Sequence, residues 1–398
     1  MPFKAHFLAL TESLRFLESF WRESSFYCFN MQWREDFPKL NDALFSMDDA
    51  TFRKMDQLPE VLAPFLSQHI PGYDNVIRLT EVAALNHRVT INPRLQVDVP
   101  GRKWSQIESF IGALPVVPST KNKTVVDWCS GKSYLGRAVA NYWGSKLHAV
   151  ECQQALCESG RALASPWVES VQFSQKDVLK DYHDFLSSDF VVALHACGDL
   201  HRSLLRQWRQ SNATHLVLAP CCYHQWFKGN YVPLSETAQS NNLVLTRNQV
   251  RLAVQEMVTS SSRVRSQVAL LGQWRMAFDL VQRDIRGVDE YLSTVSLPFS
   301  SVKKGAEFVI RTLAERKSII IPPNFDFQPY LIRAEKRYAE FQRLQLVAHG
   351  FRRALELWLV LDLVLFLEEG GCEVELASFC SRDITPRNLR ICATRKAM

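Results

Sequence analysis

Several stretches of the sequence carry residue types that could bind a nucleoside-containing cofactor. In the first, VDWCSGKSYLG from Val126 to Gly136, Asp127 ends an apolar run and small residues follow it. Such a turn lets the backbone approach a ligand closely at the carboxyl end of a strand. Glu151 ends the next apolar run, where an acidic side chain can accept both hydroxyls of a ribose. Asp177 follows a third run and could receive an exocyclic adenine amine.

Two phosphate-binding motifs are disfavoured by the same stretch. A P-loop needs a glycine five positions before Gly131, and Val126 stands there. The dinucleotide fingerprint fails because Cys129 and Tyr134 occupy two of its three glycine positions. The turn therefore predicts a cofactor site that is not of these two kinds.

Two further stretches carry groups that could handle protons or act as nucleophiles. His195 and Asp199 lie in HACGDLH, and His224 ends PCCYH. Because the first and fourth strands of a doubly wound sheet flank the ligand site, we expect His195 and Asp199 to face the substrate. Histidine titrates near neutral pH, so His195 and His224 are candidate bases.

Other interpretations of these groups stay open. A lone histidine can be a hydrogen-bonded core residue, and a lone carboxylate can be a solvated surface residue. Cys221 or Cys222 could be a covalent nucleophile or could simply be buried. Two histidines and three cysteines near one sheet edge could bind zinc, but the sequence has no Cys-x₂₋₄-Cys pair with a second matching pair, so no metal site is predicted.

The elements that must position these residues follow from the pattern of apolar runs. Five short runs alternate with helical patterns of about ten residues, which is typical of βαβ units on a parallel sheet. Two later runs predict an antiparallel hairpin at the edge of that sheet. The seven predicted strands are Thr124–Asp127, Lys146–Glu151, Ser170–Phe173, Phe190–Leu194, Leu216–Ala219, Glu373–Phe379 and Asn388–Thr394.

Four parts are predicted along the chain. Residues 1–100 form a helical N-terminal region, and residues 101–224 form the first part of the sheet domain. Residues 225–330 are an insertion after the fifth strand, where the alternation of strands and helices stops. Residues 331–398 complete the sheet domain and begin with one long helix from about Leu331 to Glu369, which ends at Gly370 and Gly371.

The composition is that of an ordinary globular protein. Of 398 residues, 47% are hydrophobic and 22% are charged, which excludes collagen-like, coiled-coil and wholly disordered chains. The formal charge of +6 is a mild basic excess, compatible with a nucleic-acid substrate. Ten cysteines without regular spacing favour free thiols in a reducing compartment, so the expected location is cytoplasmic.

No association with a membrane is expected. The apolar run Leu355–Leu367 is shorter than the ~20 residues that span a bilayer, and it contains Asp362, so it predicts a buried helix. The phenylalanines and leucines of Met1–Trp21 recur at helical spacing, which predicts an amphipathic helix of the fold rather than a leader.

The order of the motifs VVDWCSGKSYLGR, HAVE, QKDV, ALHACGDLH and LVLAPCCYH resembles class I S-adenosylmethionine-dependent methyltransferases. Within that class the sequence resembles the group that contains methyltransferase-like protein 25. The LHACGDL and PCCYH pair also resembles the tRNA 2′-O-methyltransferase that modifies the acceptor stem. The resemblance covers about Arg102 to His224 and the later TPRNLRICAT stretch.

This resemblance implies a Rossmann-like α/β sheet of seven strands, with S-adenosyl-L-methionine as cofactor. It implies that the methionine end is held by Asp127 and by the backbone from Cys129 to Gly131, and the ribose by Glu151. Asp177 and Val178 would meet the adenine. It further implies RNA, with tRNA favoured, as the substrate, and no obligate protein partner is inferred.

The first loop departs from the D/E-x-G-x-G-x-G pattern of such enzymes, because Cys129 and Ser133 replace two glycines and only Gly131 is kept. One alternative is therefore a methyltransferase fold that has lost catalysis and serves as an interaction module. A methyltransferase for small molecules or proteins is another.

Basic and aromatic residues could serve RNA binding. Arg102 and Lys103 precede the first sheet strand, and further cations gather at Arg247–Arg275 and Arg333–Arg353. If some of these line one groove, they would attract phosphates. Aromatic side chains beside PCCYH could stack on a base or pack in the core; they are Trp226, Phe227 and Tyr231.

Overall fold

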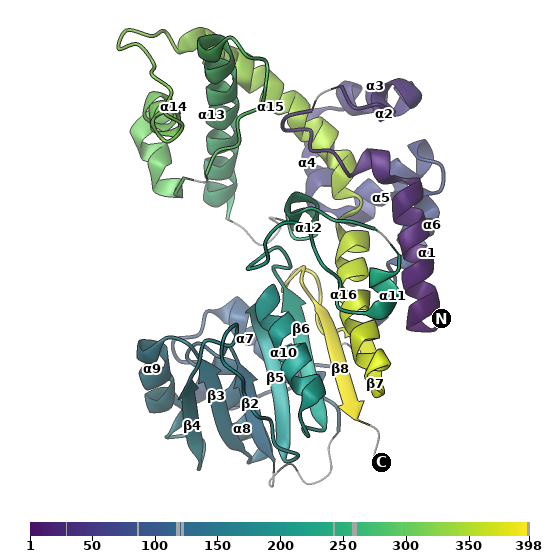
Figure 1. Cartoon of the computed structure of the whole chain (residues 1–398), viewed down its shortest axis with the longest axis vertical. Coiled ribbons are helices and arrows are strands. Elements are labelled where there is room, and N and C mark those ends of the chain that lie inside the picture. Colours follow the sequence, from purple (N-terminus) through teal and green to yellow (C-terminus); the bar gives the residue numbers. More distant parts are fainter. Residues whose placement is uncertain are drawn as a thin grey trace. The chain divides into compact units, whose positions relative to one another are not determined.

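The computed structural model describes residues 1–28, 30–85, 87–116, 120, 123–241, 243–256, 261–295 and 297–395. The chain divides into two compact units (Figure 1). Unit 1 consists of Met1–Phe16, Asn75–Glu256 and Arg352–Met398, and unit 2 of Leu17–Asp74 and Met257–Phe351. This division differs from the predicted linear order, because both the 1–100 region and the 331–398 region contribute to both units.

Unit 1 is built on an eight-stranded sheet in the order β1-β7-β8-β6-β5-β2-β3-β4. Neighbouring strands are parallel except at β8, which is antiparallel to β6 and to β7. The strands are β1 (Ala83–Ala84), β2 (Thr124–Trp128), β3 (Lys146–Glu151), β4 (Val171–Gln175), β5 (Asp189–Cys197), β6 (His215–Cys221), β7 (Cys372–Ser378) and β8 (Leu389–Arg395).

All seven predicted strands are present, and the sheet is the Rossmann-like α/β sheet that the sequence predicts. The number of strands was wrong by one, because β1 pairs with β7 through only two alanines. Two alanines give no alternating pattern that could mark a strand.

Helices cover both faces of the sheet. In Figure 1, α10 (Asp199–Gln210) lies in front of the strands and α7 (Gly101–Gly112) behind them. The core beneath α7 and α8 (Tyr134–Trp143) includes Val125 and Val192, while the adjacent residue Val191 points to the opposite face. α9 (Gln154–Ala164) packs on β3 and β4.

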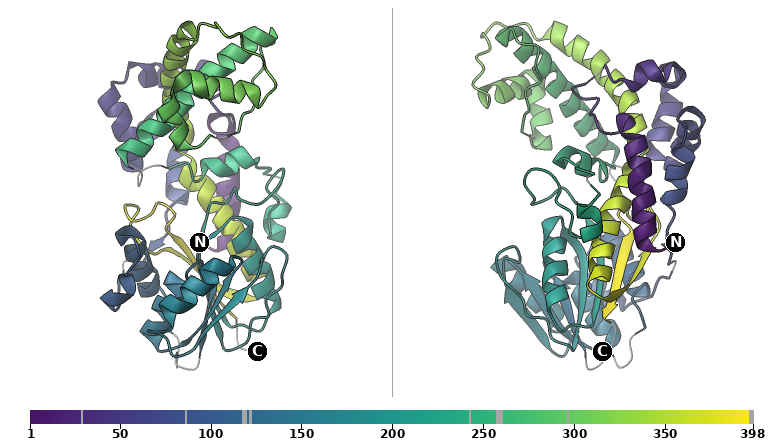
Figure 2. Two further views of the ribbon diagram at one scale, coloured as in Figure 1. Left: turned by 90° about the vertical axis from the view of Figure 1, so that its left-hand side faces the viewer. Right: turned by 45° about the vertical axis from the view of Figure 1, so that its right-hand side comes forward.

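Two helices that are far apart in the sequence lie side by side in unit 1. α1 (Phe3–Phe16) runs along α16 (Arg352–Glu369) (Figure 2). Trp358 donates its indole N–H to Thr11 Oγ1 at 2.9 Å, and its ring lies 5.2 Å from that of Phe7. Both the amphipathic first helix and the buried helix around Asp362 are confirmed. No helix in the described ranges combines the length and apolar character needed to cross a membrane.

The single long helix predicted from Leu331 to Glu369 is instead two helices, α15 (Gln328–His349) and α16. The break falls at Gly350, where an added Cβ would lie 2.2 Å from Leu66 Cδ1. A larger residue there would require Leu66 to move, while Gly350 itself keeps ordinary helical angles (φ −59°, ψ −25°).

Unit 2 is helical. Its main core lies between α13 (Ser262–Arg286), α14 (Gly305–Glu315) and α15, with Phe278 and Ile310 buried in it. Unit 2 also contains η1 (Glu18–Phe20), α2 (Trp33–Asp36), α3 (Pro38–Ser46), α4 (Asp49–Gln57), α5 (Pro59–His69) and η4 (Phe299–Lys304).

The remaining elements are short. Unit 1 contains η2 (Pro93–Gln96), α11 (Glu236–Gln239) and α12 (Arg247–Leu252), and α6 (Tyr73–Leu79) spans a boundary of the two units.

Candidate active site

The loop after β2 has the backbone of a glycine-rich turn. Cys129, Gly131 and Ser133 have φ values of 53°, 57° and 52°, in the left-handed region that glycine adopts most easily. The alternating positive φ is thus kept although two of the three residues carry side chains. The departure from the glycine pattern seen in the sequence is not a departure in conformation.

Asp127, at the end of β2, fixes the far side of this loop. Its Oδ2 accepts hydrogen bonds from Ser133 Oγ at 2.7 Å and from the Gly136 N–H at 2.9 Å. A Cβ at Gly136 would lie 2.6 Å from Asp127 Cβ, so only glycine lets α8 approach this closely. Oδ1 is then the oxygen available to a ligand.

The buried position of Asp127 changes its acidity. Desolvation raises the pKa of its carboxyl to about 6, although the hydrogen bonds from Ser133 and Gly136 and the charge of Lys103 act in the opposite direction. Asp127 is only 3% exposed. The ionised form of Asp127 at neutral pH is therefore destabilised by its burial.

Glu151, at the end of β3, lies across the loop from Asp127. Its Oε2 accepts from the Gly131 N–H at 2.9 Å, and its Oε1 accepts from the Gln153 N–H at 3.0 Å. Each carboxylate oxygen can accept a second hydrogen bond, so two ribose hydroxyls could still be bound. An added Cβ at Gly131 would meet no atom within 4 Å, which shows open space beside the loop.

Asp177 and Val178 follow β4, the last strand on this side of the sheet. The Asp177 carboxylate forms an ion pair with Lys180 at 2.9 Å and accepts from the Leu179 N–H at 3.2 Å. The hydrogen bond from Lys180 lowers the pKa of Asp177. Val178 is buried, and its carbonyl accepts from Ser203 Oγ at 2.6 Å. In this structure the contacts of the Asp177 carboxylate are therefore with residues of its own turn.

His195 lies within the last part of β5, beyond the predicted end of that strand. The pairing of β5 with β6 shifts register between Leu194 and Cys197, and His195 has φ 72°. A non-glycine residue held in this conformation stores strain, a feature that clusters at functional sites. The bulge directs the side chain to the carboxyl edge of the sheet, where it is exposed.

The hydrogen bonds around His195 assign its tautomer. Gln106 Nε2 donates to the Ile384 carbonyl at 3.3 Å, so Gln106 Oε1 is the atom that faces His195 Nε2 at 2.9 Å. Nε2 then carries the proton, and Nδ1 keeps its lone pair. Surrounding protein desolvates the ring, although solvent reaches part of it, and lowers the pKa of His195 to about 4. The imidazole is therefore neutral at physiological pH.

Asp199 begins α10 and is held by Arg202, whose Nη1 lies 2.8 Å from Asp199 Oδ1. The preceding Gly198 has φ 56°, and an added Cβ there would lie 2.2 Å from the Gln225 carbonyl oxygen. The structure thus places Asp199 in an ion pair that fixes the start of α10 beside the segment after β6.

His224 lies at the start of that segment. Its Nδ1 is buried and has no hydrogen-bond partner among the described residues, while its Nε2 lies 3.3 Å from Gln225 Nε2. Its carbonyl accepts from Arg247 Nε at 3.1 Å. Desolvation, followed by the charges of Arg251 and Arg247, lowers the pKa of His224, partly offset by Cys222.

The carboxyl ends of β5 and β6 bring three cysteines together. The sulfur atoms of Cys197, Cys221 and Cys222 all lie within 4.8 Å of one another. Hydrogen bonds with Cys197 and Cys221 lower the pKa of Cys222, whereas hydrogen bonds with Cys197 and Cys222 raise the pKa of Cys221. The sequence predicted no metal ligands here, because the grouping depends on strand register and not on a spaced motif.

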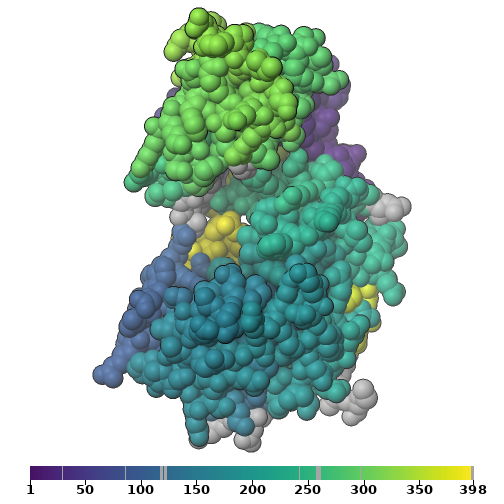
Figure 3. Space-filling model, turned by 60° about the vertical axis from the view of Figure 1, so that its left-hand side comes forward, coloured from purple at the N-terminus to yellow at the C-terminus, as the bar shows by residue number. Residues whose placement is uncertain are grey.

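Sequence reasoning named Lys103 only as a cation that could attract phosphates, and it missed Arg387 and Gln106 at this edge. Lys103 Nζ lies 4.8 Å from the centre of the Tyr134 ring and interacts electrostatically with Asp127. Arg387 comes from the β7–β8 loop, and its Nη1 is buried without a partner in the described part of the chain. Gln106 orients His195. Figure 3 shows the yellow segment of this loop between the slate-blue segment before β2 and the green segment after β6.

The other predicted RNA-binding groups separate into exposed and structural ones. Trp226 is 60% exposed, whereas Phe227 and Tyr231 are buried and pack edge to face with ring centres 6.0 Å apart. Arg343 donates to the Leu44 and Met47 carbonyls inside unit 2. The predicted cations therefore do not all serve one groove.

Comparison with known families bears on this region alone. Residues 102–228 match the family model described as "Methyltransferase domain". This part of the chain is similar to that family. The match begins in α7 and ends just after the PCCYH motif, so it includes the candidate cofactor-binding and catalytic residues from Asp127 to His224. Comparison with curated proteins gave no significant match.

Solved structures similar to this chain include several methyltransferases. A TehB-like SAM-dependent methyltransferase from Corynebacterium glutamicum shares 11% identity over 28% of this chain and 60% of its own, with a TM-score of 0.23. An RNA methyltransferase from Salinibacter ruber in complex with S-adenosyl-L-homocysteine shares 16% identity over 29% of this chain and 76% of its own, with a TM-score of 0.22.

A geranyl diphosphate C-methyltransferase from Streptomyces coelicolor shares 15% over 37% of this chain and 63% of its own, with a TM-score of 0.26. The chain thus spans somewhat less than two thirds of the Corynebacterium and Streptomyces proteins. The Salinibacter protein is an RNA methyltransferase and the Streptomyces protein a geranyl diphosphate methyltransferase, and likeness to them does not bear on the substrate of this chain.

Proposed function

We propose that this chain is an S-adenosylmethionine-dependent methyltransferase that acts on RNA, with tRNA the favoured substrate. The observation that carries the proposal is the loop between Asp127 and Ser133. Its alternating positive φ values, together with a buried acidic residue at each of two adjacent strand ends, suit a nucleoside cofactor with a charged amino-acid end.

The residues present fit this cofactor. Open space lies beside Gly131, and the Asp127 and Glu151 carboxylates border the same loop. We infer that Asp127 Oδ1 and the backbone from Cys129 to Gly131 hold the methionine end, and that Glu151 holds the ribose. Asp177 and Val178 lie where the adenine is proposed to bind. The cofactor supplies a methyl group on a sulfonium, ready for transfer to a nucleophile.

His195 is the proposed base. Its Nδ1 lone pair can take a proton from an attacking hydroxyl or amine, because the Gln106 contact keeps the ring proton on Nε2 and leaves Nδ1 unprotonated. Asp199 and His224 are proposed to position the substrate. Asp199 does so through the start of α10, and His224 through the segment after β6.

An anionic substrate suits the charges at this edge. Lys103, Arg387 and Arg247 reach the region of His195, Cys222 and His224 from three different elements. Their charges would attract phosphates regardless of base sequence, and the exposed ring of Trp226 could stack on a base. The preference for tRNA rests on the resemblance of the LHACGDL and PCCYH motifs. A cytoplasmic location is proposed with it, and the ten cysteines are all free thiols.

Calorimetric titration with S-adenosylmethionine and S-adenosylhomocysteine tests the cofactor. We expect one site per chain, with affinity reduced in Glu151→Gln and unchanged in Glu158→Gln, an exposed residue of α9 that accepts a hydrogen bond from Gln154. A tritiated-methyl assay then compares total tRNA, other RNA pools, and protein and small-molecule extracts. Transfer to proteins or small molecules alone would overturn the RNA step and leave the cofactor step standing.

A second candidate is a methyltransferase fold without catalysis that serves as an interaction module. It is favoured by the bonds of Glu151, whose two oxygens already accept from the Gly131 and Gln153 N–H groups. If the chain binds no cofactor in the titration, and mass spectrometry detects no ligand that copurifies with it, this candidate is supported and the first is refuted.

A further inference from the structure

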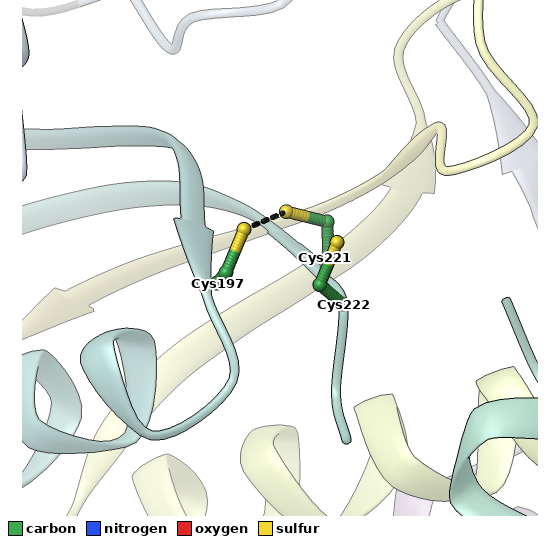
Figure 4. A group of neighbouring side chains, drawn as sticks. All are labelled: Cys197, Cys221 and Cys222. Atoms are coloured by element: carbon green, nitrogen blue, oxygen red, sulfur yellow. Dashed lines mark hydrogen bonds between the residues drawn. The ribbon is translucent and has the colours of Figure 1, made fainter. Parts of the chain in front are cut away.

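The three cysteines at the ends of β5 and β6 form a compact group of sulfur atoms. Cys197 and Cys221 are register partners on these parallel strands, and their sulfurs are 3.6 Å apart (Figure 4). Cys222 follows directly, and all three sulfurs lie within 4.8 Å of one another. In the described part of the chain, this is the one group of three or more metal-ligating side chains at such distances.

The local backbone departs from regular strand geometry in two ways that create this group. Consecutive residues of a strand point to opposite faces, so Cys221 and Cys222 would normally diverge. Cys222 instead has φ 46°, and its side chain extends to the same side as that of Cys221. The register shift between Leu194 and Cys197 places the third sulfur opposite them.

The spacing of the sulfurs matches that of ligands around one small ion. A tetrahedral zinc site with Zn–S bonds of about 2.3 Å has sulfurs about 3.8 Å apart. The Cys197–Cys221 separation of 3.6 Å is close to this value, and the remaining pairs need to move by no more than about 1 Å. Thiolates are soft ligands that select zinc over magnesium or calcium.

We propose that Cys197, Cys221 and Cys222 together bind a single Zn²⁺ ion at the carboxyl edge of the sheet. No fourth side chain belongs to the group in the described ranges, so the fourth position is open to water or to a substrate atom. Three protein ligands with one open position are typical of zinc sites that take part in chemistry. Zinc displaces one proton from each thiol that is neutral beforehand.

A positive charge stands beside this group. Three thiolates and one Zn²⁺ carry a net charge of −1, and Arg387 interacts electrostatically with both Cys197 and Cys222. Arg387 Nη1 is buried and has no hydrogen-bond partner among the described residues. A buried donor of this kind is costly when it faces no acceptor, and an anionic metal site would supply one.

The experiment uses the full chain, freed of metal by a chelator and kept in a phosphine reductant so that no disulfide forms. Titration with Co²⁺ is expected to reach one ion per chain, with sulfur-to-cobalt charge-transfer absorption and the visible bands of tetrahedral cobalt. Zn²⁺ should then displace the cobalt. Cys222→Ser should weaken Co²⁺ binding by at least about 100-fold, since even second-shell changes cost 10–100-fold.

Cys152→Ser is the matched control, because Cys152 is an exposed free cysteine outside the group. It should bind one Co²⁺ with the spectrum of the parent chain. The proposal is overturned if no stoichiometric cobalt binds, if the spectrum lacks sulfur ligation, or if Cys222→Ser binds as the parent does.

A second measurement on the unaltered chain guards against a variant that fails to fold. Zn²⁺ should protect three cysteines from a thiol-reactive reagent in the native state, and peptide mapping should identify them as Cys197, Cys221 and Cys222. Protection of none of them, or of a different set, would contradict the proposal. Neither readout depends on cofactor binding, so the zinc site and the proposed methyl transfer can fail separately.

Discussion

The buried carboxylate of Asp127 predicts how cofactor binding depends on pH. Desolvation raises its pKa to about 6, and the groups that face it are Ser133, Gly136, Lys103 and Glu151. If the ionised form of Asp127 binds the cofactor's ammonium group, a proton on Asp127 competes with the cofactor. S-Adenosylmethionine should therefore bind more weakly as the pH falls through about 6.

The size of the effect follows from the pKa. The apparent Kd rises by the factor 1 + 10^(pKa − pH), which for a pKa of about 6 is close to 1 at pH 7.5 and about 11 at pH 5. An 11-fold change corresponds to about 1.4 kcal/mol of binding free energy. The pKa of His195 is about 4, so this imidazole stays neutral across most of that range.

Calorimetric titration at pH 5.0, 6.0, 7.0 and 7.5 in buffers of equal ionic strength measures this factor. Asp127→Asn is the control, because it keeps the shape of the side chain and removes its titration. This variant should bind weakly at every pH and lose the dependence between pH 5 and 7.5. The reasoning is refuted if the parent chain binds with equal affinity at pH 5 and 7.5, or if Asp127→Asn keeps the parent's dependence of affinity on pH.

The same pKa has the opposite consequence for folding. The unfolded carboxyl has a pKa of 3.8, so the folded protein holds the proton more tightly. Below pH 3.8 Asp127 does not lower the free energy of unfolding. As the pH rises to about 6, its ionisation lowers that free energy by up to about 3 kcal/mol. Asp127→Asn should therefore raise the free energy of unfolding relative to the parent by more at pH 7 than at pH 4, provided the amide keeps the Ser133 and Gly136 bonds. Urea denaturation at both pH values measures this difference.

Further predictions follow from other contacts. Ser133→Ala removes a donor to Asp127 and should move the midpoint of the binding profile to higher pH. His195→Asn should lower methyl transfer by roughly 10²–10⁴-fold while cofactor affinity, measured by calorimetry, changes little; equal loss of both would assign His195 a structural role. Asp362, fully buried, accepts from the Leu234 and Ser235 N–H groups and the Tyr231 hydroxyl, so Asp362→Ala should cost about 3–5 kcal/mol in urea denaturation, and a cost below 1 kcal/mol would contradict this network.

The sheet could be predicted because each long strand is an apolar run bounded by residues that break it. The positions of Asp127 and Glu151 at strand ends followed from the same pattern. What could not be predicted depends on contacts between distant residues. The close approach of Cys197 to Cys221 requires the register of β5 against β6, and the third sulfur requires the positive φ of Cys222.

The division into units also lay beyond the sequence pattern. Helical periodicity runs through Gly350 without interruption, so the break between α15 and α16 is not visible in the sequence pattern. In the same way, the sequence predicts α1 as an amphipathic helix, but its residues alone do not predict that it packs on α16. The hydrogen bond that orients His195 likewise comes from Gln106 on a distant helix.

The strand order has a consequence for synthesis on the ribosome. β6 pairs with β8, which is made only after residues 222–388 have been added. At about 5–20 residues per second, this takes on the order of 10–30 s. Until β8 is made, the backbone edge of β6 along Leu216, Val217 and Leu218 has no strand to pair with on that side. Fragments that stop before β7 keep this unpaired edge and should therefore aggregate rather than fold.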